Sequence, residues 1–490
     1  MPETRTEKDS LGSLEVPKDT YYGIFTERAK NNFQISGQRA HPEFINALII
    51  LKKACATANT KLGLLDKNVG KAIIQACDEI LQGKLRDQFV LDVFQAGAGT
   101  PFNMNANEVI ANRATEILGG TKGQYLVHPN NHVNMSQSSN DVIPTTIRMA
   151  CVVLLTALVK ELQLTEQSWK NKAKEYDKVI KIGRTHYQDA VPMTYGQVFA
   201  SYAVALQRAL EDLIQAQTSL LELGIGGTAI GTGMNTHPRF RFGVVEELKK
   251  FTGIKFTPTE NMVETTWNMT VFVKVSSTLK GLAVVLDKLS KDLMFLSSGP
   301  DTCIHEITLP EAEPGSSIMP GKVNPSILEC LSMVCYEVMG NDTTITIAAD
   351  SGHLELNVMT PVIAYNLFNS MDFLTRAVKM WRTLCVEKLS VNKEQCTTNV
   401  NKSLIVVTAL NPYLGYEVGA GIVKRALAEK KPLRQIIEEQ NIVPKEYLDK
   451  LLDVERMTQP TSIDPSLKKK VLEYEGFKKF KERGFKESVP

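Results

Sequence analysis

The stretch from Gly315 to Pro325, GSSIMPGKVNP, combines residue types that can remove a proton beside a carboxylate. It holds two adjacent hydroxyls beginning at Ser316, an ammonium at Lys322 and an amide at Asn324. A serine is a poor base at its free pKa, so it needs fixed N–H donors and a nearby cation to exist briefly as an alkoxide. We expect Gly321 and Lys322 to supply them. Two glycines and two prolines exclude a helix and predict a flexible loop, although a connector with a surface lysine has the same composition.

Two further clusters are rich in uncharged hydrogen-bonding side chains. The first runs from Gly97 to Asn107 and includes Thr100, and the second is NMSQSSND, residues 134–141, before a helix predicted to start at Pro144. Both suit hydrogen bonds to an anion, and both also suit ordinary caps and turns. Neither cluster indicates a binding site by itself.

The segment GRTHYQD, residues 183–189, is predicted to be a polar loop between two long helices. A lone histidine is more often structural than catalytic. Here, however, His186 stands between Thr185 and Asp189 on a connector, where polar residues often carry function.

Two other motifs are set aside. The glycine-rich segment 226–233 lacks the lysine of a phosphate-binding loop and has no evident strand before it, so we interpret it as a bend between helices. His128 and His132 are four residues apart, but Pro129 interrupts the helix that would align them. Without cysteine or carboxylate partners nearby, no metal site is expected.

Bulk composition narrows the class of protein. The 490 residues carry 56 Lys and Arg against 54 Asp and Glu, so the net charge of +2 predicts neither a nucleic acid nor a membrane as partner. Eight scattered cysteines form neither a disulfide framework nor a zinc spacing, and the charged N-terminus lacks an apolar leader. The most apolar run, Met149–Val159, is too short for a membrane span. We expect a cytoplasmic protein.

Long helices must position the polar connectors. Apolar residues alternate in steps of four and three from Val275 to Leu296, and a second such seam runs from Phe199 to Leu220. With the helical patterns near 147–178, 325–348 and 360–386, about five long helices are predicted. A thin bundle of them would leave apolar seams exposed, so we expect the chain to associate with copies of itself.

The loop GSSIMPGKVNP resembles the signature loop of the fumarase/aspartase superfamily, and the resemblance extends from about Arg5 to about Pro460. It implies an all-α fold with a long central helical bundle flanked by smaller N- and C-terminal domains, assembled as a homotetramer whose active sites are shared between subunits. We place the N-terminal domain at residues 1–143, the bundle at 144–389, and a small C-terminal helical domain with a basic tail at 390–490. No cofactor is implied.

The resemblance also assigns roles to individual residues. Ser316 matches the base that takes a C3 proton from a substituted succinate, and His186 with Glu329 matches a catalytic histidine and its carboxylate partner. The remaining matches are to positions that bind the small dicarboxylate substrate: Thr100, Ser138, Ser139, Asn140, Thr185, Lys322 and Asn324. The product of such an elimination is fumarate.

The leaving group is either ammonia or water. Segments such as Gln95–Thr100, Leu296–Pro300 and Gly340–Thr344 resemble the aspartate ammonia-lyases, whereas Ser138–Asp141 resembles the class II fumarases. Pro101-Phe102 fits neither branch well. The balance favours the ammonia-lyase branch, with fumarate hydratase as the alternative. A structural tetramer without catalysis is a third hypothesis, because some superfamily members serve as lens proteins.

Overall fold

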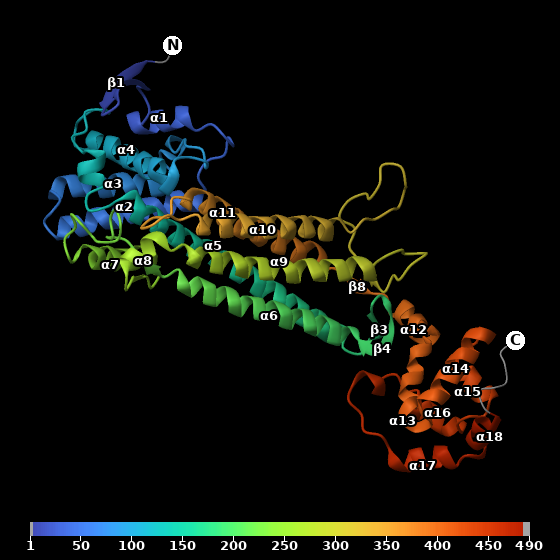
Figure 1. Ribbon diagram of the computed structural model, residues 1–490. Coiled ribbons are helices and arrows are strands. Elements are labelled where there is room, and N and C mark those ends of the chain that lie inside the picture. Colours follow the sequence, from blue (N-terminus) through green and yellow to red (C-terminus); the bar gives the residue numbers. More distant parts are fainter. Residues whose placement is uncertain (1–2, 484–490) are drawn as a thin grey trace. The chain divides into compact units, whose positions relative to one another are not determined.

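A computed structural model of the protein describes residues 3–483, and their contacts divide the chain into two compact units (Figure 1). Each unit is built from three stretches of sequence. Unit 1 comprises residues 1–163, 208–287 and 330–379, and unit 2 comprises 164–207, 288–329 and 380–490. The three consecutive domains expected from the sequence are a different division and stay a prediction.

Five long helices are present, as the sequence predicted, and each contributes residues to both units (Figure 1). They are α5 (Ser139–Glu175), α6 (Tyr195–Ser219), α9 (Thr270–Leu296), α10 (Ser326–Asp350) and α11 (Thr360–Trp381). Within unit 2, the Trp169 ring of α5 packs on Phe199 of α6 and Trp381 of α11, with ring centroids 5.1 and 5.6 Å apart.

The two apolar seams are the core of the fold. Every seam position of α9 from Val275 to Leu296, and every seam position from Phe199 to Leu220, is at most 8% exposed. The seams are therefore covered within the chain, and the expectation that they stay exposed was wrong. Other faces of the same helices carry exposed apolar side chains, among them Val284, Met333, Tyr336 and Ile347.

Unit 1 adds short helices and two small sheets to its share of the long helices. The strands are β1 (Thr4–Asp9), paired antiparallel with β2 (Gly12–Pro17), and β5 (Glu222–Leu223), paired parallel with β6 (Thr257–Pro258). The helices are α1 (Ile24–Asn32), α2 (Pro42–Lys61), α3 (Lys67–Leu81), η1 (Arg86–Gln88), η2 (Gly97–Gly99), α4 (Thr100–Ile117), η3 (Pro129–Val133), α7 (Phe240–Thr252) and α8 (Met262–Trp267).

Unit 2 contains a β-hairpin and a run of short helices. β3 (Ile180–Thr185) pairs antiparallel with β4 (Gln188–Thr194), and β7 (Ile307–Thr308) pairs with β8 (Ser390–Val391). The helices are η4 (Arg382–Val386), α12 (Lys393–Lys402), η5 (Leu404–Leu410), α13 (Asn411–Leu414), α14 (Tyr416–Glu429), α15 (Leu433–Glu439), α16 (Lys445–Leu451), η6 (Arg456–Thr458), α17 (Pro465–Glu473) and α18 (Glu475–Arg483).

The helices after Leu404 have an apolar core of their own. It is lined by buried side chains from Val407 to Phe477, and Pro432 and Pro444 precede α15 and α16, as the proline spacing predicted. Leu467, Val471 and Phe477 belong to this core, so the lysine-rich end is folded through α18. The last part of the basic tail, residues 484–490, lies outside the described residues.

The mainly helical class is confirmed, with local departures. Segment 183–189 is a hairpin rather than a loop, because β3 and β4 pair across it. Helix α5 starts at Ser139 and takes Pro144 into its second turn. A two-residue strand, β5, does precede the glycine-rich bend at 226–233.

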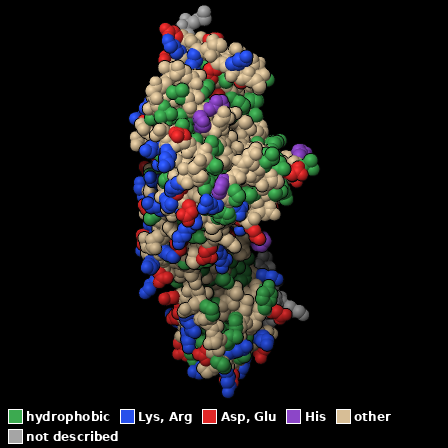
Figure 2. Space-filling view, turned by 90° about the vertical axis from the view of Figure 1, so that its left-hand side faces the viewer, with side chains coloured by type: hydrophobic (Ala, Val, Ile, Leu, Met, Phe, Trp, Pro, Cys, Tyr) green, Lys and Arg blue, Asp and Glu red, His purple; other side chains and the backbone are tan. Residues whose placement is uncertain are grey.

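Among the described residues, α5 is long and apolar enough to cross a membrane by length and composition alone. It contains the run Met149–Val159, and 78% of its most apolar 18-residue window is buried inside the protein. Core helices pass the same test. Figure 2 shows basic and acidic side chains interspersed on the face it displays, in keeping with the balanced charge.

Candidate functional site

The residues singled out in the sequence belong to both units, and each unit is described by itself. Thr100, Ser138, Ser139 and Asn140 lie in unit 1. Those in unit 2 are Thr185, His186, Ser316, Lys322, Asn324 and Glu329.

The stretch 315–325 is a loop, as predicted, and α10 begins directly after it at Ser326. Its two ends are tied together. The Gly315 N–H donates to the Lys322 carbonyl at 2.8 Å, and the Asn324 amide donates to the Gly315 carbonyl at 2.7 Å. A Cβ at position 315 would lie 2.3 Å from the Lys322 carbonyl oxygen, so only glycine allows this approach.

Ser316 sits just inside the closed base of the loop. Its Oγ accepts hydrogen bonds from the backbone N–H groups of Ile318, at 3.2 Å, and Met319, at 3.0 Å. Such donors stabilise negative charge on oxygen, which is what a serine base requires. The same bonds also shape the turn, as serine side chains commonly do.

The expectation that Gly321 would supply an N–H donor to Ser316 was wrong. The N–H groups that donate to Ser316 Oγ are those of Ile318 and Met319. Gly321 instead has a φ of +82°, a value suited to glycine in a tight turn. The ammonium of Lys322 is exposed and has no hydrogen bond or ion pair with residues 3–483. It remains available to an anion.

The hairpin carries His186 at its tip. His186 and Tyr187 are the two turn residues, with φ of +53° and +58°, the signs that a type I′ turn requires. This turn favours Asn and Gly, so His and Tyr adopt it at a cost of order 1–3 kcal/mol each. Thr185, His186 and Tyr187 are exposed.

A buried carboxylate anchors the base of this hairpin. Glu306 is 0% exposed, and its two oxygens accept hydrogen bonds from Arg184 at 2.7 Å, Asn399 at 2.9 Å and the Tyr195 hydroxyl at 3.0 Å. The ammonium of Lys181 lies 3.6 Å away. Two strand residues, one residue of α6 and one of α12 therefore meet on one side chain.

Charge complementarity keeps Glu306 ionised. Burial by itself would raise its pKa, but the Arg184 hydrogen bond, the Lys181 charge and the Asn399 amide outweigh burial and hold the pKa of Glu306 below its ordinary value. Burial, then the negative charge of Glu306, raises the pKa of Tyr195 well above its usual range, so Tyr195 stays a donor.

His186 and Glu329 are not brought into contact within the described chain. Glu329 is exposed in the first turn of α10, and no hydrogen bond or ion pair joins it to His186 among residues 3–483. Their pairing stays a prediction.

In unit 1, Ser139 and Asn140 begin α5 beside a polar network. The Asn103 amide donates to Ser139 Oγ at 3.1 Å, and the Asn140 amide donates to the Ala229 carbonyl at 2.7 Å. Asp141 accepts from the N–H groups of Ser138, Gly226 and Thr228 at 2.9–3.0 Å. The glycine-rich bend is thus bound to the start of α5.

Lys52, on α2, completes this network and was missed in the sequence. It is fully buried and donates to Asn134 Oδ1 at 3.0 Å and Gln137 Oε1 at 2.9 Å. Burial, only partly offset by the charge of Asp141, lowers the pKa of Lys52 to about 8. Burial likewise raises the pKa of Asp141 to about 6.

Thr100 is the first residue of α4, and the two residues after it are structural. Pro101 occupies the first turn, where its missing N–H costs nothing, and Phe102 is buried against Phe44 with ring centroids 5.2 Å apart. Pro101 and Phe102 therefore have structural roles in this chain.

The two histidines set aside in the sequence are used locally. His128 Nδ1 accepts from the N–H groups of Asn130 and Asn131, and His132 Nδ1 accepts from the His128 N–H at 2.9 Å. In the described part of the chain, no three His, Cys, Asp or Glu side chains are grouped to hold a metal ion.

Comparison with known protein families identifies the family to which this chain belongs. Residues 12–340 match the family described as "Lyase", and residues 406–459 match the one described as "Fumarase C C-terminus". The chain belongs to this lyase family, the fumarase/aspartase superfamily, as its loop predicted.

Individual relatives cover almost the whole chain. "Aspartate ammonia-lyase" of Helicobacter pylori (strain ATCC 700392 / 26695) is 46% identical over 93% of this chain and 98% of its own length, and that of Escherichia coli (strain K12) is 43% identical over 93% and 96%. Among solved structures, "fumarate lyase:delta crystallin" of Brucella melitensis has a TM-score of 0.91 at 44% identity, and "class II fumarase" of Schistosoma mansoni has a TM-score of 0.91 at 37%. Both structures cover 94% of this chain and 100% of their own.

The Glu306 anchor gives a stability prediction. Glu306→Ala leaves the cations of half-buried Arg184 and buried Lys181 without their carboxylate, so the free energy of unfolding should fall by about 3–5 kcal/mol. Glu306→Gln keeps an acceptor oxygen and should cost less. Glu246→Ala, which removes an exposed ion-pair partner of Lys250, is the matched control and should change stability by under about 1 kcal/mol. Denaturant unfolding of the three variants measures this, and equal losses in all three would contradict the anchor.

The lowered pKa of Lys52 gives a pH prediction. Between about pH 8 and pH 10.5 the unfolded chain binds more protons at this lysine than the folded chain does, so raising the pH stabilises the folded protein. In this window the free energy of unfolding of the wild type, relative to that of Lys52→Met, should rise by about 1 kcal/mol per pH unit. Leu48→Met, a neighbouring change without a titrating group, should give a constant difference. A constant difference for Lys52→Met as well would refute the assigned burial effect.

Proposed function

We propose that this protein catalyses the reversible elimination of ammonia from L-aspartate to give fumarate. The observation that carries the proposal is the identity of 43–46% to aspartate ammonia-lyases over at least 93% of the chain. The unbroken loop GSSIMPGKVNP, which holds the chemistry such a reaction needs, agrees with it.

Ser316 is the proposed base. As an alkoxide held by the Ile318 and Met319 N–H groups, it takes a C3 proton of aspartate. The electron pair of the broken C–H bond enters the neighbouring carboxylate, which then carries two negative charges as an aci-carboxylate. When the pair returns to form the C2–C3 double bond, the C2–N bond breaks, its electrons leave with nitrogen as ammonia, and fumarate remains.

The doubly charged intermediate requires fixed donors and a cation. Lys322, whose ammonium has no partner among residues 3–483, is the proposed cation, and Asn324 is the proposed amide donor of the same loop. Thr100, Ser138, Ser139, Asn140 and Thr185 are proposed to bind the carboxylates and the amino group. Hydroxyls and amides suit this task because they give hydrogen bonds without adding charge.

His186 and Glu329 are proposed to act as a pair on the leaving-group side. His186 is held in a fixed turn at the exposed tip of the hairpin, where its ring can contact a substrate or another subunit. A second subunit would bring a carboxylate such as Glu329 to it, because the site is proposed to be shared between chains.

Assembly as a homotetramer is proposed on two grounds. Four candidate residues are exposed, namely Thr185, His186, Lys322 and Glu329, and the long helices expose apolar side chains such as Met333 and Ile347. We further propose a cytoplasmic enzyme without cofactor, nucleic acid or membrane partner. The division into domains 1–143, 144–389 and 390–490 is kept as a proposal.

Fumarate hydratase is the second candidate. Two observations favour it: the fold of the Schistosoma mansoni class II fumarase, and the run Ser138–Asp141 that resembles the fumarases. A non-catalytic structural tetramer is the third candidate, and any turnover of aspartate or malate would remove it.

Ser316→Ala tests the base. A general base usually contributes 10²–10⁴-fold, so kcat for ammonia release should fall at least about 100-fold. The variant should keep the mass of the wild-type assembly by light scattering, because the change lies on an exposed loop. Retention of more than about a tenth of the activity would exclude Ser316 as the base, and a monomeric wild type would remove the proposed tetramer.

The leaving group is tested by comparing substrates. Purified protein should release ammonia from aspartate with kcat/KM at least tenfold above that for dehydration of malate, a gap of about 1.4 kcal/mol in transition-state binding. Fumarate absorbance near ~240 nm follows both reactions. Faster turnover of malate would make fumarase the answer and leave the role of Ser316 unchanged.

A further inference from the structure

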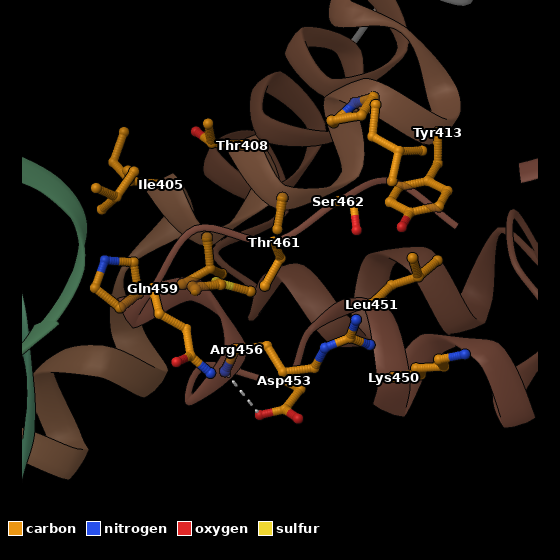
Figure 3. Close-up of a pocket in the computed structure, with 17 residues that line it drawn as sticks. Ile405, Thr408, Tyr413, Lys450, Leu451, Asp453, Arg456, Gln459, Thr461 and Ser462 are labelled. Carbon is orange, nitrogen blue, oxygen red and sulfur yellow. Dashed lines mark hydrogen bonds between the residues drawn. The ribbon is translucent and has the colours of Figure 1, made fainter. Parts of the chain in front are cut away.

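Unit 2 contains a cavity that no residue of the loop 315–325 lines. Its volume is about 240 Å³, and it is bounded by β4, η5, α13, α16, η6 and the segment 459–463 (Figure 3). Small-molecule sites usually measure about 300–1,000 Å³. The cavity therefore suits a molecule of amino-acid size and is too small for a nucleotide.

Two opposite charges line the cavity without pairing. The Arg456 guanidinium makes no hydrogen bond or ion pair with residues 3–483, and in Figure 3 it lies between Asp453 and Leu451. Asp453 uses Oδ1 to accept the N–H groups of Glu455 and Arg456, at 3.0 and 3.4 Å, which leaves Oδ2 for a ligand. A third charge, Lys450, is occupied by Asp464 at 3.2 Å.

The remaining walls are apolar with a few hydroxyls. Val191 and Ile463 are 51% and 47% exposed, although both are large aliphatic residues that burial would stabilise. Leu451 lies beside them in the lining. The Ser462 hydroxyl has no hydrogen-bond partner among residues 3–483, and in Figure 3 it points toward the side on which Arg456 lies.

We propose that this cavity binds a zwitterionic α-amino acid with a short apolar side chain. The ligand's carboxylate pairs with Arg456, its ammonium with Asp453, and its aliphatic side chain covers Val191 and Ile463. A simple anion satisfies only Arg456 and leaves Asp453 facing like charge. A dicarboxylate places a second negative charge against the apolar wall, which costs desolvation without a partner.

The cavity is connected to the hairpin that carries His186. Val191 and Pro192 of β4 form one wall. The Ser403 hydroxyl donates to Asp189 at 2.8 Å, and the Gln197 amide donates to the Thr458 carbonyl at 2.7 Å. A ligand between β4 and η6 therefore restrains the hairpin. Through this restraint the ligand would regulate the elimination at His186, an effect that rests on the function proposed above.

Titration calorimetry with L-valine and L-leucine as probes tests the site on the intact protein. Wild type should bind at least one of them with a sub-millimolar Kd, and Arg456→Gln and Asp453→Asn should each weaken binding at least tenfold. Asparagine keeps the acceptor for the Glu455 and Arg456 N–H groups, so Asp453→Asn removes charge without opening η6. Arg425→Gln, on the exposed face of α14, is the matched control and should bind like wild type.

Three outcomes overturn the proposal. They are no binding of either amino acid at ~10 mM, equal loss in the Arg425→Gln control, and equally tight binding of isovalerate, which is valine without its amino group. Hydrogen exchange supplies a readout independent of activity, since peptides covering residues 186–194 should become more protected when the amino acid binds. If ammonia release fails while binding and protection hold, only the proposed function falls; if binding fails while ammonia is released, only this site falls.

Discussion

The ionised carboxylate of Glu306, removed from water, is the interaction on which the order of unit 2 depends. Its side chain joins β3, α6 and α12 through Arg184, Tyr195 and Asn399. Its backbone N–H donates to the Leu296 carbonyl at the end of α9, and its carbonyl accepts from Asn392 before α12. A buried charge is tolerated only where several partners compensate it, so these segments cannot separate one at a time.

A related arrangement without a close ion pair organises unit 1. Lys52 and Asp141 are both buried, and each is satisfied by neutral groups: amide oxygens for the lysine and backbone N–H groups for the aspartate. Asn134 is the shared centre, because its Oδ1 accepts from Lys52, Asn103 and Asn107. The polar cluster at the start of α5 is therefore held by contacts from α2 and α4.

How much the sequence predicts depends on the range of the interaction. The seams of α6 and α9 could be found because helical period is local, and all their positions are buried. Which face stays exposed depends on neighbours distant in sequence, so the seams were wrongly expected at the surface. The hairpin at 180–194 was missed because its His186-Tyr187 turn lacks the Gly or Asn that marks a type I′ turn.

The candidate site shows the same limit. The glycines and prolines of residues 315–325 were enough to predict a loop. Which backbone N–H groups donate to Ser316 depends on the turn that the loop forms, and composition does not specify that turn. Lys52 follows the apolar run LIIL of α2, and a lysine on a buried face was the available signal. Glu306 carried no local signal, since its partners come from positions 181–195 and 399.

The tied base of the loop 315–325 bears on the entropy of any closure over a ligand. Two hydrogen bonds already fix Gly315, Lys322 and Asn324, while the side chain of Ile318 at the tip is 82% exposed. Ordering one residue costs about 1–2 kcal/mol of backbone entropy. Because the base is ordered in advance, this penalty is confined to the tip, and the aliphatic Ile318 side chain can offset part of it by leaving water when the tip settles.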